Sequence, residues 1–216
     1  MNIIDISQII QEDMQVYPGD PIPLIENFLI HKNDYCHVNK LILGSHTGTH
    51  IDAPYHFFND GQKITEFPLQ KFIGEGIVID VSGKKEEEMI YPSDLEKYCE
   101  HLKNKFALFY TGWDIYFNSN KYLKHPFLAK ECAELLVESG ASLVGIDALN
   151  VDGSLKEEYP VHNILLKNNI LIVENLTKLL ETTGKAGLYS FLPLKIKDAD
   201  GSPIRAVFIE QSQNRD

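Results

Sequence analysis

The segment Ser45–Phe57 constrains this chain most, because it gathers four side chains that can bind a metal ion into one short stretch. They are His46, His50, Asp52 and His56, and all of these positions are even-numbered. Side chains on an extended chain alternate between two faces with a period of two, so an extended segment would direct all four to one side. Threonine, glycine and proline within the segment disfavour a helix.

Three imidazoles and a carboxylate on one face need a partner, because unpaired buried polar groups cost free energy. A divalent cation is the natural partner, since these groups are ordinary metal ligands. Gly48 falls on the same face and leaves room for an ion. The donor set accepts zinc or manganese, and the sequence leaves this choice open.

A fully ligated or dinuclear site needs further ligands, and the best candidates are His162 and Glu174. Glu174 directly follows the apolar run 170–173, which places its carboxylate at the edge of the core, where charged groups are usually exposed or paired. Strand ends are also where α/β proteins commonly build sites. The alternatives remain open: a packed or capping role for His162, and for Glu174 a role in stabilising the dipole of the next helix.

Charge and cysteine content narrow the class of protein. The net charge of −11, from 20 basic and 31 acidic residues, argues against non-specific binding of nucleic acid or of anionic membranes. The three cysteines are far apart, which fits a reducing compartment. We see no signal-peptide pattern and no apolar stretch of membrane-spanning length. We therefore expect a cytoplasmic enzyme that acts on a small molecule.

The apolar pattern predicts one mixed α/β domain over residues 1–216. Strands and helices alternate in the second half, which favours βαβ units. One helix is predicted over Ala129–Glu138, a second over Leu176–Glu181 after an Asn175 cap, and a third from a Ser93 cap to about Lys103. The predicted strands are Ile3–Ile6, Asn39–Leu43, Ile77–Val81, Ala107–Thr111, Leu143–Ile146, Ile170–Val173 and Ile204–Ile209.

The run from His46 to His56, HTGTHIDAPYH, resembles the signature of the cyclase family of metal-dependent hydrolases, which includes bacterial kynurenine formamidases (arylformamidases) and isatin hydrolases. The resemblance implies a single mixed α/β domain of the swivelling β/β/α type and a homodimer. It covers nearly the whole chain, through Asp5–Ser7, Tyr17–Asp20, Thr111–Trp113, Gly145–Asp147, His162–Leu166, Glu174–Leu176 and Ser202–Val207.

The same resemblance implies a role for each candidate residue. One or two divalent ions would be held, zinc being preferred to manganese, with Asp52 bridging between them. His56 would be the general acid/base rather than a permanent ligand. The first ion would bind His46, His50 and Asp52, the second would bind His162, and Glu174 would bind one or both.

These parts suit hydrolysis of an amide, either N-formyl or cyclic. A bound ion lowers the pKa of its water to ~7, and an imidazole moves the proton to the leaving nitrogen. Tyr17 stands where the formamidases carry a tryptophan that lines the substrate pocket, which implies a roomier or more polar pocket. The alternatives are a cyclic-amide hydrolase of the isatin type and a non-catalytic metal-binding protein on the same scaffold.

Overall fold

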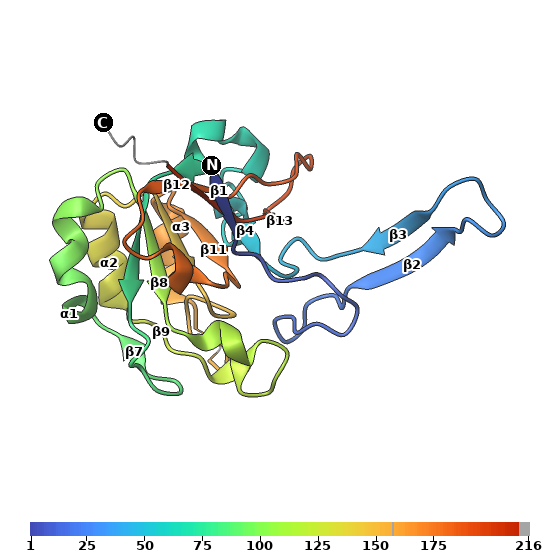
Figure 1. The fold of residues 1–216 in the computed structure, drawn as a ribbon. Coiled ribbons are helices and arrows are strands. Elements are labelled where there is room, and N and C mark those ends of the chain that lie inside the picture. Colours follow the sequence, from blue (N-terminus) through green and yellow to red (C-terminus); the bar gives the residue numbers. More distant parts are fainter. Residues whose placement is uncertain (157, 212–216) are drawn as a thin grey trace.

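The computed structural model describes residues 1–156 and 158–211, and a six-stranded sheet runs through its centre (Figure 1). The strands that build the site belong to this sheet. Four neighbouring strands in it are parallel, and the two strands at one edge pair antiparallel. In spatial order the strands are β13 (Gly201–Pro203), β4 (His50–Asp52), β11 (Leu171–Glu174), β10 (Leu143–Ile146), β8 (Phe106–Tyr110) and β6 (Gly76–Asp80).

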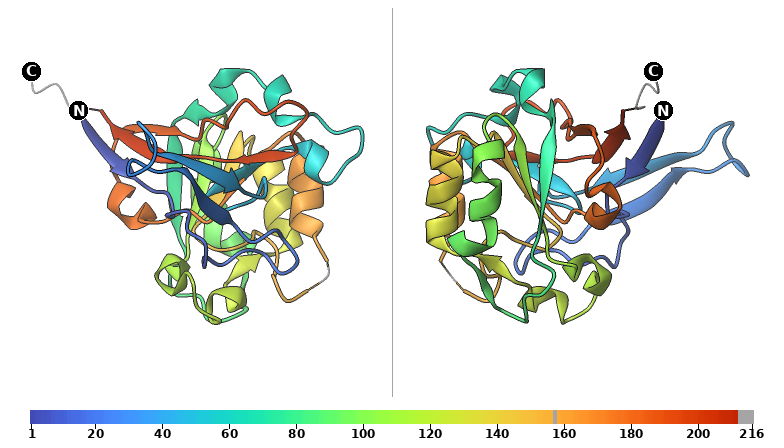
Figure 2. Two further views of the ribbon diagram at one scale, coloured as in Figure 1. Left: turned by 90° about the vertical axis from the view of Figure 1, so that its right-hand side faces the viewer. Right: turned by 60° about the vertical axis from the view of Figure 1, so that its left-hand side comes forward.

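A second, antiparallel sheet covers one face of the first, and helices cover the other face (Figure 2). The second sheet contains β1 (Asn2–Asp5), β14 (Val207–Glu210), β12 (Gly187–Ser190) and β5 (Ile73–Gly74). Side chains of the central strands alternate between two cores. Phe109 and Ile172 pack with the helices, whereas Leu108 and Val173 pack against the second sheet. Burial on both faces explains why these strands read as continuous apolar runs.

Two helices cross over between the parallel strands, and the sequence pattern predicted the first of them. The chain runs from β8 through α2 (Lys130–Glu138) to β10, and then through α3 (Pro160–Lys167) to β11. The predicted stop after α2 is confirmed by Gly140, whose φ of +72° suits glycine. Helix α3 was not predicted, although proline at its first position is a recognised start signal.

The remaining elements are small. The four-residue helix α1 (Pro92–Leu95) continues as a 3₁₀ helix over Glu96–His101. A short parallel pair joins β7 (Met89–Ile90) to β9 (Phe127–Leu128). Strands β2 (Leu24–Leu29) and β3 (Val38–Ile42) form a hairpin. It projects into solvent from the side of the molecule that lies opposite the helices (Figure 1). We call residues 24–42 the arm; Figure 1 shows it standing clear of the layers.

Each predicted strand overlaps an observed one, and the helix predicted from Ser93 overlaps α1 and the 3₁₀ helix that follows it, but one helix prediction is wrong. Residues 176–181 do not form a helix, because Asn175 and Lys178 have positive φ and the Leu176 N–H donates to Ile146 of β10. Only a 3₁₀ turn forms, over Leu179–Thr182.

The cap before α1 also differs from the prediction. The helix begins at Pro92 rather than after Ser93, and the Asp94 carboxylate accepts the Tyr91 N–H at 2.8 Å. Within the described residues, no helix is both long enough and apolar enough to cross a membrane.

Candidate metal centre

Strand pairing brings together three of the candidate ligands, His50, Asp52 and Glu174. His50 and Asp52 share one face of β4, while Ile51 between them packs into the core under the second sheet. In the antiparallel pair of β4 with β11, His50 stands directly opposite Glu174, the last residue of β11. Directly paired residues share a sheet face, so all three side chains meet on the helix side of the sheet. All three are buried.

The first turn of α3 brings in His162. Its backbone N–H and that of Val161 donate to the Asp152 carboxylate at 3.0 and 2.9 Å, so Asp152 caps the helix. His162 Nδ1 lies 2.8 Å from the same carboxylate. Its Nε2 therefore faces the strands, 3.5 Å from Asp52 Oδ2 and 3.4 Å from Glu174 Oε1.

His46 and His56 reach the site by other routes, which corrects the expectation of one extended segment. His46 lies in a turn before β4, where Gly48 has a φ of +66°. His56 ends a 3₁₀ helix over Pro54–His56. The period-of-two argument is therefore right for His50 and Asp52 alone, because proline and glycine end the extended backbone on either side.

The structure brings all five predicted ligands together as two groups that share Asp52. The ligand atoms of His46, His50 and Asp52 lie within 4.8 Å of one another, and so do those of Asp52, His162 and Glu174. His46 Nδ1 is 2.7 Å and His50 Nε2 is 3.3 Å from Asp52 Oδ1. Two donor sets joined by one carboxylate could hold two ions; the ligand roles themselves remain predictions.

The electrostatics of this cluster fit a cation. Burial lowers the pKa of His46, but Asp52 and Asp200 raise it to about 10. Burial likewise lowers the pKa of His162, but Asp152 and Asp52 raise it to about 10. Burial raises the pKa of Asp52, yet His50 and His46 hold it well below its usual range. The carboxylates thus attract positive charge strongly enough to retain protons on neighbouring imidazoles.

One buried oxygen marks a ligand position directly. Asp52 Oδ2 has no hydrogen-bond partner within the described residues, although it is shielded from solvent. An unpaired buried carboxylate oxygen is costly unless a cation satisfies it. Oxygen and imidazole donors at this spacing therefore fit a divalent metal ion.

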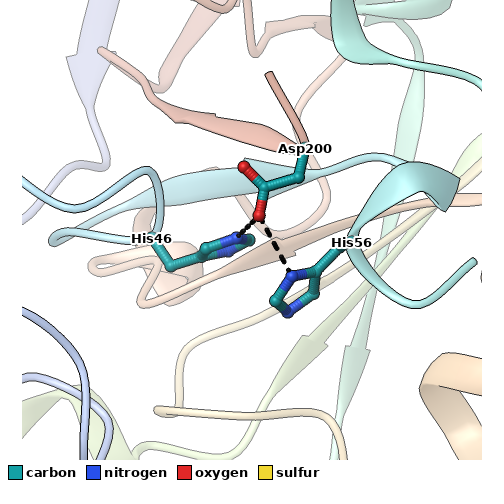
Figure 3. Close-up of side chains that lie close together, drawn as sticks. All are labelled: His46, His56 and Asp200. Carbon is teal, nitrogen blue, oxygen red and sulfur yellow. Dashed lines mark hydrogen bonds and ion pairs between the residues drawn. The ribbon is translucent and has the colours of Figure 1, made fainter. Parts of the chain in front are cut away.

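Two carboxylates that the sequence reasoning missed hold the histidines in place. Asp152 holds His162, as described above. Half-buried Asp200 lies 2.9 Å from His46 Nε2 and 3.2 Å from His56 Nδ1 (Figure 3). No local signal distinguishes Asp200, because it lies 154 residues from His46 in the chain. The one related feature in the sequence is the glycine that follows Asp200. A Cβ at Gly201 would lie 2.9 Å from the His46 ring, so glycine is needed where this segment passes the histidine.

A pocket of about 240 Å³ opens onto the cluster. Its walls include three aromatic side chains, Tyr17, Phe57 and Tyr159, and the hydroxyl groups of the two tyrosines lie 3.0 Å apart. Burial and the Tyr159 hydroxyl raise the pKa of Tyr17, so its phenol stays protonated. Neither lysine nor arginine is among the described residues that line this pocket. Tyr17 thus lies where the resemblance placed it, and its contact with substrate remains a prediction.

Comparisons with known proteins agree over nearly the whole chain. The model of a family described as "Putative cyclase" matches residues 4–153. A kynurenine formamidase of Bacillus anthracis is 38% identical over 207 residues, which cover 94% of this chain and 95% of that protein. A related kynurenine formamidase of Bacillus mycoides (strain KBAB4) is 36% identical over 215 residues, with the same coverage of both chains.

Solved structures share the fold. Isatin hydrolase A from Labrenzia aggregata superimposes with a TM-score of 0.87 at 23% identity, covering 96% of this chain and 93% of that one. A potential metal-dependent hydrolase with cyclase activity superimposes with a TM-score of 0.78 at 26% identity, covering 98% of this chain and 99% of that one. The mixed α/β architecture expected from the sequence is confirmed.

Proposed function

This chain belongs to the cyclase family, and from that premise we propose that it is a metal-dependent hydrolase of the arylformamidase type, which cleaves the amide C–N bond of an N-formyl aromatic amine. One observation carries the proposal. Two donor sets share Asp52 at the base of an aromatic-walled pocket, and the imidazole of His56 lies beside them at the pocket wall. The similarity to kynurenine formamidases over 94% of the chain supports this reaction class.

The donor sets would hold two divalent ions, and zinc is our first choice. His46, His50 and Asp52 would bind one, while Asp52, His162 and Glu174 would bind the other. A divalent ion in such a site supplies Lewis acidity, which lowers the pKa of a coordinated water to ~7 and polarises a carbonyl oxygen. Imidazoles and carboxylates bind zinc and manganese alike, so the identity of the ion needs direct measurement.

His56 would move the proton. Its side chain is 32% exposed, and its Nδ1 is engaged by Asp200, which leaves Nε2 for the pocket. As water attacks the formyl carbon, His56 takes up the proton that the water loses. It then delivers this proton to the departing nitrogen as the C–N bond breaks, releasing formate and a free amine. Imidazole suits this transfer because its protonation changes near neutral pH.

The pocket chemistry favours an aryl substrate. Tyr17, Phe57 and Tyr159 present ring surfaces on which a planar aromatic amide can stack. Tyrosine at position 17, where the formamidases carry tryptophan, leaves more room and adds a hydroxyl group. We therefore propose that the preferred substrate is larger or more polar at this wall than N-formylkynurenine.

Steady-state hydrolysis of N-formylkynurenine and of isatin, measured with zinc- and manganese-loaded protein, tests the proposal. We expect turnover of the formamide, and Tyr17→Trp should increase kcat/KM for N-formylkynurenine. Wild-type kcat/KM for that compound of about 10⁴ M⁻¹s⁻¹ or more, within the ordinary enzyme range, would exclude the altered specificity. Turnover of isatin alone would favour the cyclic-amide reading, and turnover of neither would favour a non-catalytic metal-binding protein.

We further propose that the protein acts as a homodimer in the cytoplasm. The arm exposes apolar side chains on both strands; Phe28 is 69% and Leu41 58% accessible in the single chain. Exposed apolar surface of this kind commonly marks a protein contact. Cys36, Cys99 and Cys132 are free thiols in the described part of the chain, which suits a reducing compartment. Light scattering on wild type and Phe28→Asp would test the dimer.

A further inference from the structure

The Asp200 carboxylate holds two histidines with one oxygen. Asp200 directly precedes β13, the strand that pairs with β4. Its Oδ2 accepts a hydrogen bond from His46 Nε2 at 2.9 Å and from His56 Nδ1 at 3.2 Å (Figure 3). The two imidazole rings lie 3.9 Å apart between centroids, with an interplanar angle of 32°. One side chain therefore contacts both a candidate metal ligand and the candidate acid/base.

The contact with Asp200 determines which ring nitrogen of His46 is available to bind a metal ion. His46 has carboxylates at both ring nitrogens, Asp52 at Nδ1 and Asp200 at Nε2. In the absence of an ion, protons on both ring nitrogens satisfy the two carboxylates. An ion bound beside Asp52 and His50 would displace the Nδ1 proton, and because Asp200 holds the other proton on Nε2, the Nδ1 lone pair would be the one that faces the ion. A carboxylate behind a ligating histidine selects the tautomer and ring orientation in this way.

The same carboxylate determines the tautomer of His56. Donation from Nδ1 to Asp200 leaves the Nε2 lone pair to accept a proton from water in the pocket. Loss of Asp200 would free the ring to rotate about its side-chain bonds, because this hydrogen bond is the one polar contact that the His56 side chain makes within the described residues.

We propose that Asp200 is the positioning residue of this site, whose single carboxylate orients His46 towards the first ion and His56 towards the substrate. This inference rests on the proposed function in assigning those two roles. The hydrogen bonds of Asp200 and the histidine tautomers can be measured whether or not the protein hydrolyses an amide.

The test compares Asp200→Asn with the matched control Asp198→Asn, two residues earlier. Asp198 is exposed and pairs with Lys63 at 2.6 Å, away from the cluster. Three quantities are measured on folded, metal-loaded protein: kcat and KM, zinc content with affinity by chelator competition, and histidine tautomers by long-range ¹H–¹⁵N NMR. The NMR signals are assigned by their loss in His46→Gln and His56→Gln.

We expect wild type to show His46 protonated at Nε2 and His56 protonated at Nδ1. Asp200→Asn should change both tautomer populations, weaken zinc binding by 10–100-fold and lower kcat at least 10-fold with KM little changed. Asp198→Asn should match wild type. Wild-type tautomers opposite to these, or unchanged tautomers and zinc affinity in folded Asp200→Asn, would overturn the proposal.

Three further outcomes bear on the proposal. Loss of one whole ion per chain in Asp200→Asn would make Asp200 a direct ligand and would contradict the positioning role. If Asp200→Asn does not fold, the wild-type tautomers and Asp200→Glu, which keeps the carboxylate, decide the matter. If wild type hydrolyses no amide, the proposed function fails, while the tautomer and zinc measurements still test Asp200.

Discussion

At the scale of single residues, Asp52 is the centre of the site. Its Oδ1 lies 2.7 Å from His46 and 3.3 Å from His50, and its unpaired Oδ2 lies 3.5 Å from His162. Three imidazoles from a turn, a strand and a helix thus surround one buried carboxylate. Neighbouring histidines can nevertheless differ in role, because His56 contacts Asp200 rather than Asp52.

The difference in role predicts different losses on mutation. His56→Ala should retain its metal while kcat falls by 10²–10⁴-fold, the usual contribution of a general acid/base. His50→Ala should lose metal as well as activity, because His50 belongs to the buried donor cluster. Metal analysis beside steady-state kinetics checks both variants. Equal loss of metal from the two would make His56 a ligand and our assignment wrong.

His125 should make stability depend on pH away from the site. Burial lowers its pKa to about 4, while its ring bonds Ser154 Oγ and the Pro126 carbonyl. The unfolded chain, with a histidine pKa near 6.5, binds the proton more readily than the folded protein does. The stabilisation is complete above pH 6.5 and is lost as pH falls towards 4, by about 3 kcal/mol.

Urea denaturation of wild type and His125→Gln at pH 7 and pH 4 measures this effect. Glutamine keeps hydrogen-bonding capacity but does not titrate, so the variant should lose about 3 kcal/mol less over that range. Parallel pH profiles for the two proteins would show that the pKa of His125 is the same in the folded and unfolded states, which would contradict the prediction. Other acidic groups titrate in both proteins and cancel in the comparison.

At the scale of elements, the site depends on irregular backbone joined to a strand. Strand β4 carries two candidate ligands, but the 3₁₀ helix over Pro54–His56 positions His56, the proposed acid/base. The following turn packs tightly on that helix: Gly61 N–H bonds Phe58, and a Cβ at Gly61 would lie 2.4 Å from the carbonyl carbon of Pro54. Only backbone movement could admit a side chain there.

Gly61→Ala should therefore displace the 3₁₀ helix and His56 with it. We expect a loss of about 1–3 kcal/mol in the free energy of unfolding, as for overpacking elsewhere, and a lower kcat with metal content unchanged. The matched control is Gly83→Ala, where a Cβ would meet nothing within 4 Å. Thermal unfolding and kinetics compare the two, and equal behaviour would show that the turn adapts without cost.

At the scale of the whole molecule, the cluster joins distant parts of the chain. His46–Asp52, His162 and Glu174 come from three segments that meet only where β4 pairs with β11 and α3 packs beside them. An ion bound by all three would link these segments in the folded state and find no such site in the unfolded chain. Metal binding should therefore stabilise the fold as a whole.

Removal of metal should lower the melting temperature. Zinc at a thousand times its dissociation constant would add about 4 kcal/mol to the free energy of unfolding. Calorimetry of chelator-treated protein with and without added zinc measures the shift, and Asp52→Asn should show a smaller one. A wild-type melting temperature that does not respond to zinc or manganese would contradict the ligand assignment.

The sequence by itself determined the strands of the core and identified the candidate ligand residues of the site. Apolar runs and helical spacing are local properties, so they predicted the parallel strands and helix α2 of the βαβ half. The segment His46–His56 is equally local, and it holds four of the candidate site residues. Only the tertiary structure decided the arrangement of those donors. The Asp152 cap on α3 and the Asp200 bridge to two histidines arise from contacts across the chain. Residue spacing cannot predict such contacts, because they form only when separate strands and loops pack together.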